Sequence, residues 1–451
     1  MKNIASILSS VGPAFSSVAS TLSIFASSSS TFVTQLLAVW LISQEDQRAL
    51  LILTVFMPFG FTLSSLSDAM RAGALPIVSS HEDAGSAEVH SAVATLFGMA
   101  LVVFGGLGAM VWGLMPLLQS YFHLPIVAYL DFSDLLLAMT LVFLPITVSS
   151  ILTTCLFAKE KNALATSIVV VANVLQLSLI FIFAKQGHGV MSMPYAAACS
   201  TLVAITMGLT LSPTLRQIIA PRALAYFSAM QTQVKQLLSI IVPIFSSYLL
   251  LIAWLFYITY ILLQYSDAAA SAFPLYARIQ NLIIMLSIAV GVSQAIRFNK
   301  NSADYDYSML KNSVTQFVSQ SILYQIPVLL AVFIFSENIA LWLVNEPSIA
   351  AECAEYLRMI SPALLVLSTY VGMTVYMEQT FRSRRAFIYN ALYLGGEVAL
   401  IEMVRPYCTT SSELYALLAV AFFASAIFIL FEIGRSRYEY HLMQKMQSVT
   451  L

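Results

Sequence analysis

Ionisable side chains are scarce inside the long apolar stretches of this chain, and four of them could do chemistry. Asp68 and Arg71 are three residues apart, so on a helix they share one face and can neutralise each other. Arg278 and Glu397 lie in two other apolar stretches. An ionised side chain at bilayer depth costs roughly 2.5–3.5 kcal/mol on insertion scales. Each of the four therefore needs a partner, water or a function.

Each of these residues has a structural and a functional interpretation. Asp68 either forms a local pair with Arg71 or faces a central cleft, where it binds a proton or a cation. Arg278 either extends to the outer membrane interface or anchors an anionic group. Glu397 either forms a structural hydrogen bond or takes part in transport. The residue types alone leave these alternatives open.

Composition sets the class of protein. Of 451 residues, 59% are hydrophobic and only 10% are charged, which is too little charge to coat a soluble domain of this size. The net charge of -1 and the lack of a Lys/Arg block argue against a nucleic-acid partner. We find no paired carboxylates, nucleophile elbow, phosphate-binding glycine loop or metal-ligand spacing. We therefore expect an integral membrane protein that is not an enzyme and needs no metal or cofactor.

The hydrophobic pattern predicts an all-α polytopic fold of about twelve transmembrane helices. Crossing about 30 Å of hydrocarbon takes roughly 20 apolar residues. Segments of at least about that length occupy residues 12–43, 49–80, 89–118, 126–157, 163–184, 190–212, 236–264, 269–297, 311–342, 351–380, 386–404 and 413–433.

Loop charge predicts the orientation. With both termini in the cytoplasm, fifteen Lys and Arg residues fall on the inside and four on the outside, Arg48, Lys185, Arg358 and Arg405, a clear positive-inside bias. The predicted parts are an N-terminal six-helix lobe at 1–212, a cytoplasmic linker at 213–235, a C-terminal six-helix lobe at 236–433 and a cytoplasmic tail at 434–451.

An internal repeat indicates that the two lobes are pseudo-symmetric six-helix bundles. The pattern Leu-Ser-x-x-x-Pro-x-Phe-Ser-Ser occurs at 8–17 and again at 238–247, each time at the start of a long apolar segment. Paired repeats in a bilayer are typical of secondary transporters, whose substrate site lies between the repeats.

Several stretches resemble the multidrug and toxic compound extrusion (MATE) transporters, within the wider superfamily that also contains lipid-linked oligosaccharide flippases. The clearest is 272–297, which resembles the family's eighth helix with its mid-helix Gly291 and its terminal Arg297. Residues 75–85, 189–198 and 355–361 resemble parts of the second, sixth and tenth helices more loosely.

The chain also departs from the family. Many members carry a coupling carboxylate in the first helix, or acids in the seventh and tenth, whereas here 11–43 has no acid. The stretch around Trp254 is apolar, and the tenth segment offers the hydroxyl groups of Ser368 and Tyr370. In the fifth segment Asn173 falls where the family has a polar residue, with Gln176 as its nearest polar neighbour. Asn173 and Gln176 either line a cavity or form interhelical hydrogen bonds.

The resemblance implies a secondary active transporter of the inner (cytoplasmic) membrane. It would export amphipathic organic compounds by proton- or sodium-coupled antiport with alternating access, and we expect it to act as a monomer. A flippase for a lipid-linked saccharide or another anionic lipid precursor is the alternative, and a non-transporting scaffold is a third possibility. The predicted substrate or ion site comprises Asp68, Arg71, Asn173, Gln176, Arg278, Ser368, Tyr370 and Glu397, with Asp68 ranked first and Glu397 second.

Overall fold

The computed structural model describes residues 2–45, 49–81, 83, 85–122, 126–219, 230–303, 308–343 and 346–450. Within these ranges the chain is built from helices and short connections, without a strand. The predicted all-α fold class is confirmed.

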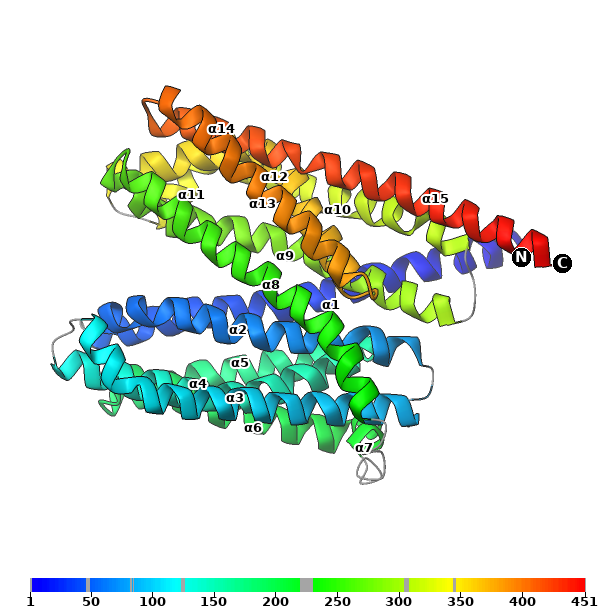
Figure 1. Ribbon diagram of the computed structural model, residues 1–451, viewed down its shortest axis with the longest axis horizontal. Helices are drawn as coiled ribbons and strands as arrows, with labels where there is room; N and C mark the ends of the chain where they lie inside the picture. Colours follow the sequence, from blue (N-terminus) through cyan, green and yellow to red (C-terminus); the bar gives the residue numbers. More distant parts are fainter. Residues whose placement is uncertain are drawn as a thin grey trace. The chain divides into compact units, whose positions relative to one another are not determined.

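The helices follow one another along the chain with few long connections (Figure 1). The first half contains α1 Lys2–Glu45, α2 Ala49–Ser80, α3 Ala87–Phe122, α4 Ile126–Ala158, α5 Asn162–Lys185, α6 Ser192–Leu211 and α7 Pro213–Ile219. The second half contains α8 Met230–Leu263, α9 Asp267–Ala303, α10 Ser308–Ile334, α11 Ser336–Leu343, α12 Pro347–Glu378, α13 Ser383–Val404, α14 Ser411–Ala424 and α15 Ala426–Thr450.

Eleven helical stretches in the described part are long and apolar enough to cross a membrane. The expected segment at 49–80 is the helix α2, which is not among the eleven. The last span, Ser411–His441, combines α14 and α15 across a break at Ser425. Large apolar side chains such as Val102 and Trp112 are more than 70% exposed, as expected for surfaces that face lipid.

The chain divides into two compact units, Ala26–Phe245 and a second unit made of Met1–Phe25 and Ser246–Leu451. The divisions fall within α1 and α8, the two helices that carry the repeated Leu-Ser-x-x-x-Pro pattern. Of the predicted linker, Pro213–Ile219 forms α7, whereas 220–229 lies outside the described residues. The predicted lobe boundaries stay a prediction.

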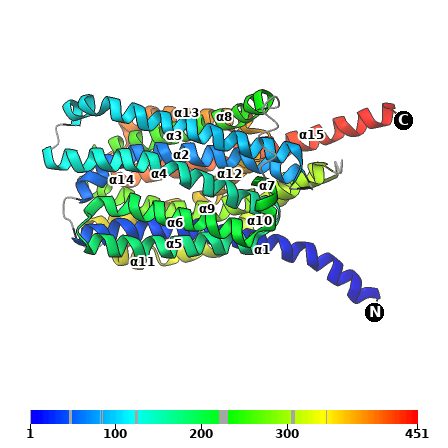
Figure 2. The same ribbon diagram turned by 90° about the horizontal axis from the view of Figure 1, so that it is seen from below.

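The Ala26–Phe245 unit is held together by close helix pairs and by polar cross-links between helices. Among these pairs, α5 and α6 lie side by side (Figure 2). Thr147 of α4 donates a 2.9 Å hydrogen bond to Ser67 of α2. The buried ring of His90 on α3 lies 2.7 Å, through Nδ1, from the carbonyl oxygen of Ile218 on α7. These cross-links set the depth of each helix relative to its neighbour.

In the second unit α9 and α12 pack with their backbones in contact. A Cβ atom added at Gly372 would lie only 2.6 Å from the carbonyl oxygen of Ser287, and one added at Gly291 would collide with Gly372 itself. Small residues permit this approach, the usual way in which membrane helices pack tightly. A rigid α9–α12 pair therefore forms the centre of the unit.

A buried hydroxyl and amide network joins this pair to α10. Ser321 shares hydrogen bonds with Ser287 of α9 and, at 3.3 Å, with Thr369 of α12, and it accepts a 2.8 Å hydrogen bond from Gln325. Ser368 donates to the amide oxygen of Gln325 and to the backbone of its own helix. All five side chains are at most 1% exposed.

Candidate functional site

Asp68 and Arg71 form the local ion pair that their spacing allows. Arg71 Nη2 lies 3.2 Å from Asp68 Oδ1, both on α2. The two side chains are partly exposed, 43% for Asp68 and 39% for Arg71. The charge of Asp68 is therefore balanced within its own helix.

Asn173 joins α5 to α1 in the same unit. Its side-chain nitrogen donates to Ser30 Oγ at 2.8 Å and to Thr31 Oγ1 at 3.1 Å, and the side chain is 8% exposed. Of the two alternatives for Asn173, this geometry is an interhelical hydrogen bond. Gln176, one turn further along α5, is half-buried and forms no hydrogen bond with the described residues.

Arg278 lies on an exposed face of α9 and forms no ion pair with any described residue. It is separate from the second-unit residues Ser368 and Tyr370, which are both at most 1% exposed. Ser368 belongs to the network with Gln325, and the hydroxyl of Tyr370 donates a 2.9 Å hydrogen bond to Asn390 of α13. Of these three predicted site residues, Ser368 and Tyr370 are buried and hydrogen-bonded, whereas Arg278 is exposed.

Glu397 differs from the other candidates because it is buried without a partner. Its side chain is 3% exposed, and neither carboxylate oxygen has a hydrogen-bond partner among the described residues. The indole nitrogen of Trp254 on α8 and the hydroxyl of Tyr393 are the hydrogen-bond donors that lie beside the carboxylate. Four buried polar atoms therefore converge on one point, and none of them makes a hydrogen bond of good geometry, which in a folded protein calls for an explanation.

The sequence of α13 explains how Glu397 comes to be buried. The buried residues of this helix form one stripe, with the spacing of three and four residues that one helical face requires: Ser383, Ala386, Tyr389, Tyr393, Glu397 and Ile401. Side chains on a helix point back toward its N-terminus, so the carboxylate of Glu397 approaches Tyr393 one turn earlier. The polar residues of the stripe must pack against α8, α12 and α15.

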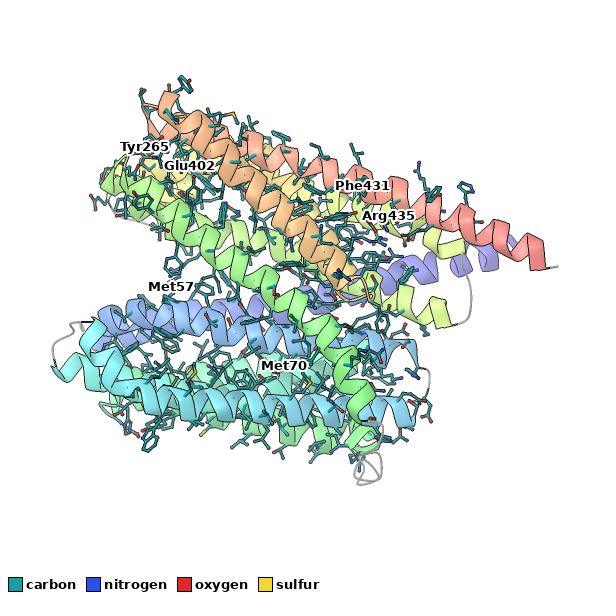
Figure 3. The ribbon with its side chains drawn as sticks, in the orientation of Figure 1. Met57, Met70, Tyr265, Glu402, Phe431 and Arg435 are labelled. Carbon is teal, nitrogen blue, oxygen red and sulfur yellow. The ribbon has the colours of Figure 1, made fainter. Side chains whose placement is uncertain are left out.

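The ionisable groups at the other end of α13 are paired. Glu402 accepts a 2.8 Å hydrogen bond from Tyr257 and lies 3.4 Å from Arg405. Figure 3 shows Glu402 toward one end of this unit and Arg435 of α15 toward the other. The expected pair of Glu402 with Arg405 is present, which leaves Glu397 as the unpaired acid of this helix.

An aromatic column continues from Glu397 along α13. The ring of Tyr393 lies 5.0 Å from that of Tyr370 on α12. Phe428 of α15 contacts both of these rings and also Tyr389, at centroid distances of 5.5–6.4 Å. Three tyrosines thus surround one phenylalanine, and each is at most 7% exposed.

A charge cluster closes this column where α12 ends and α13 begins. Glu432 of α15 is fully buried; it lies 3.0 Å from Arg385 and 3.6 Å from Arg382, and it accepts a 2.9 Å hydrogen bond from Tyr389. Both arginines also contact Glu439, one at 3.0 Å and the other at 3.7 Å. Ion pairs at this burial stabilise only with good geometry, which the two short Arg385 contacts provide.

Sequence reasoning did not single out Tyr393, Glu378 or Glu432, and it treated Trp254 as apolar. Glu378, at the end of α12, is 6% exposed and forms no hydrogen bond or ion pair with the described residues. The one available signal was the four-residue spacing of Tyr389, Tyr393 and Glu397. The positions of Trp254 and Glu432 beside this stripe depend on how α8 and α15 pack, which no local pattern gives.

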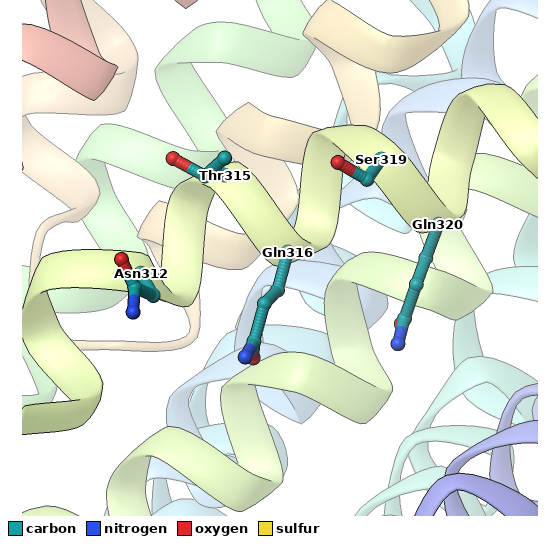
Figure 4. Close-up of a pocket in the computed structure, with 5 residues that line it drawn as sticks. All are labelled: Asn312, Thr315, Gln316, Ser319 and Gln320. Carbon is teal, nitrogen blue, oxygen red and sulfur yellow. The ribbon is translucent and has the colours of Figure 1, made fainter.

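A polar groove of about 380 Å³ also lies along α10 (Figure 4). It is lined by uncharged residues of this single helix, Asn312, Thr315, Gln316, Ser319 and Gln320. Gln320 accepts a 2.6 Å hydrogen bond from Gln294 of α9. The lining contains no acid or base, so the groove has no group that could titrate.

Comparison with known proteins finds a family model that matches part of the second half of the chain. Residues 243–400 match the family model MatE. No match was found among curated protein sequences.

The whole chain is similar in fold to several solved transporters. A mutant of the Vibrio cholerae MATE transporter VcmN matches 94% of this chain and 97% of its own, at a TM-score of 0.86 and 16% identity. A MOP superfamily transporter from Pyrococcus furiosus is described as having a binding pocket of reversed polarity. It matches 95% of this chain and 96% of its own, at a TM-score of 0.82 and 14% identity. An outward-facing multidrug resistance MATE transporter matches 94% of this chain and 96% of its own, at a TM-score of 0.81 and 14% identity.

At these identities the solved structures establish the fold, while the family model covers most of the segment that holds Trp254, Tyr370 and Glu397. The resemblance noted in the sequence is therefore confirmed, and the chain is a multi-pass membrane protein with the MATE fold whose second half matches the MatE family.

Proposed function

We propose that this protein is a secondary active transporter that exports amphipathic organic compounds by proton-coupled antiport, with Glu397 as the group that binds the proton. The MATE fold and the MatE match over 243–400 support export of small organic molecules. The same match favours an exporter over a flippase for lipid-linked saccharides. The other predicted properties belong to this proposal: location in the inner membrane, cytoplasmic termini, a monomeric state and alternating access.

The burial of Glu397 is the observation that carries the proposal. An ionised carboxylate without a partner costs at least roughly 2.5–3.5 kcal/mol at bilayer depth, whereas the protonated form avoids most of this cost. A group of this kind exchanges a proton whenever its surroundings alternate between dry and wet. A conformational change that wets the carboxylate would release the proton, and its reversal would recapture it.

The surroundings of Glu397 favour a proton over a sodium ion. Transporter sodium sites use several oxygen ligands, often carbonyl groups of unwound helices. Here α13 is continuous through Glu397, so its carbonyl groups are engaged in the helix. The nearest polar groups, Trp254 Nε1 and the Tyr393 hydroxyl, are hydrogen-bond donors. They suit an acid that alternates between its protonated and ionised forms.

The energy available is sufficient to drive a conformational switch. If ionisation of Glu397 changes the balance of two conformations by the roughly 2.5–3.5 kcal/mol quoted above, their ratio changes by about 100-fold. A ligand shifts an equilibrium only by its differential affinity for the two states, and here that ligand is the proton. Asp68, Arg71 and Arg278 remain in the proposal as residues that tune the substrate site.

Flux in proteoliposomes tests the proposal. Export of amphipathic cations is measured under separate proton and sodium gradients for the unmodified protein, Glu397→Gln and Asp68→Asn. The matched control is Glu402→Gln, which alters an exposed acid of the same helix. We expect proton-driven flux that Glu397→Gln abolishes and Glu402→Gln retains.

Three outcomes would contradict the proposal. Proton-driven flux that survives in Glu397→Gln would remove this residue from coupling, and its loss in Asp68→Asn alone would transfer the role to Asp68. Failure of every cation under both gradients, together with translocation of lipid-linked anions, would establish the flippase alternative instead.

A further inference from the structure

Glu397 is 3% exposed, so a proton bound there needs a route to water. The buried stripe of α13 leads away from it toward the start of the helix, through Tyr393 and Tyr389. The eight residues from Glu397 to Tyr389 span about 12 Å at 1.5 Å per residue. This part of the route lies inside one unit.

The tyrosine rings along this route lie close to one another, directly or around Phe428. Tyr393 lies beside the Glu397 carboxylate, and its own hydroxyl is buried and lacks a hydrogen bond. Its ring is 5.0 Å from that of Tyr370, whose hydroxyl is held by Asn390 at 2.9 Å. Tyr370 and Tyr389 both contact the ring of Phe428.

The route ends in groups that reach water. Tyr389 donates its hydroxyl to Glu432 at 2.9 Å. Arg385 bridges Glu432 and Glu439, with contacts of 3.0 Å to each. Glu439 is 26% exposed, on the side that loop charge predicts to be cytoplasmic.

We propose that protons leave Glu397 through the second unit itself, along Tyr393, Tyr370 and Tyr389 to Glu432, rather than only through the substrate pathway. This inference rests on the proposed proton coupling. It assigns a transport function to a tyrosine column that packing alone would not require to be polar.

Each transfer conserves protons and charge. The carboxyl group of Glu397 gives its proton to the oxygen of Tyr393 while Tyr393 passes its own hydroxyl proton onward, so every phenol gains one proton as it loses one. Water molecules that enter when the unit opens bridge the hydroxyls that are not in direct contact. At the end Glu397 is ionised and one proton has been released at the cluster of Glu432 and Glu439.

Other titratable groups face this route. Tyr257 of α8 and Tyr356 of α12 lie near Glu397. Glu378 of α12 interacts with Tyr370, and Arg385 with Tyr389. Tyr356 donates a 2.8 Å hydrogen bond to Gln280, which directs its hydroxyl away from the column.

Phenylalanine substitutions test the route because they keep each ring and remove only its hydroxyl. The variants are Tyr393→Phe and Tyr389→Phe. The control is Tyr376→Phe, which removes a buried hydroxyl of α12 that bonds Ser313 outside the column. Two rates are measured in proteoliposomes: proton release driven by an external substrate gradient, and substrate-for-substrate exchange at equal pH, which requires no net proton transfer.

We expect Tyr393→Phe to slow substrate-driven proton release by roughly 100-fold, the lower end of what a positioned proton-transfer group contributes, while exchange stays at the unmodified rate. Tyr389→Phe should slow release in the same selective way, and Tyr376→Phe should change neither rate. A merely structural role would lower both rates together.

The outcomes separate this inference from the proposed function. If the unmodified protein couples substrate to protons and both column variants release protons at its rate, the route is refuted and the coupling remains. A parallel loss of release and exchange in both variants would also refute the route. If the unmodified protein moves no protons, the coupling and the route are both wrong.

Discussion

The close contact of α9 and α12 makes Gly372→Ala a strong test of the packing described above. The added Cβ would lie 2.6 Å from Ser287 O, whereas ordinary contact begins at 3.4 Å. The obstructing atom belongs to the backbone, so no side-chain rotation can relieve the collision. The two helices would have to separate by roughly 0.8 Å, the difference between these distances.

This separation has a calculable cost. Overpacking a well-packed core costs about 1–3 kcal/mol, and a backbone obstruction favours the upper part of that range. Alanine regains up to about 1 kcal/mol of helix propensity over glycine, which leaves a net loss of about 2 kcal/mol. The 3.3 Å hydrogen bond between Ser321 and Thr369 would stretch beyond bonding distance as α12 moves.

Thermal unfolding in detergent measures the effect. For a unit of this size, a loss of 2 kcal/mol lowers the midpoint by roughly 4–8 °C. Gly396→Ala is the control, because it lies within α13 and an added Cβ there meets nothing within 4 Å. It should leave the midpoint unchanged or raise it slightly. A Gly372→Ala midpoint equal to that of Gly396→Ala would refute the close approach of α9 and α12.

Two further substitutions test the polar contacts of each unit by the same unfolding measurement. Glu432→Gln leaves Arg385 without its buried partner and should lower the free energy of unfolding by about 3 kcal/mol. Its control, Arg435→Gln at a 44% exposed site, should lower it by at most about 1 kcal/mol. Equal losses would contradict the burial of the cluster. Asn173→Leu removes two hydrogen bonds to α1 and should lower the free energy of unfolding by about 1 kcal/mol. Gln176→Leu on the same helix should leave it nearly unchanged. An unchanged stability of Asn173→Leu would show that α5 does not depend on these two bonds.

Much of the fold can be predicted from local patterns in the sequence. Apolar stretches of at least about 20 residues predict membrane helices because a bilayer leaves few other ways to satisfy the backbone. The short pairings were also predictable, because Asp68 with Arg71 and Glu402 with Arg405 are three residues apart on one helix. Two helix breaks were not predicted: α11 is separate from α10, and the last span is interrupted at Ser425.

The candidate site was only partly predictable. Glu397 stood out as a deep acid, but nothing in the sequence showed that it lacks a partner. Ser368 and Asn173 were also candidates, ranked below it, and the structure gives both of them hydrogen-bond partners on neighbouring helices. A polar side chain inside a membrane has the same appearance in the sequence whether its neighbours satisfy it or not.

The sequence by itself determined the membrane class, the helical architecture, the local ion pairs and the family resemblance, because each depends on composition or on spacing within one segment. Only the tertiary structure decided which polar groups are satisfied. The contacts of Glu397 with Trp254, of Tyr393 with Tyr370 and of Tyr389 with Glu432 join α8, α12, α13 and α15. Such contacts depend on how each helix is rotated and how deep it lies, which side-chain packing fixes jointly across all the helices of the unit.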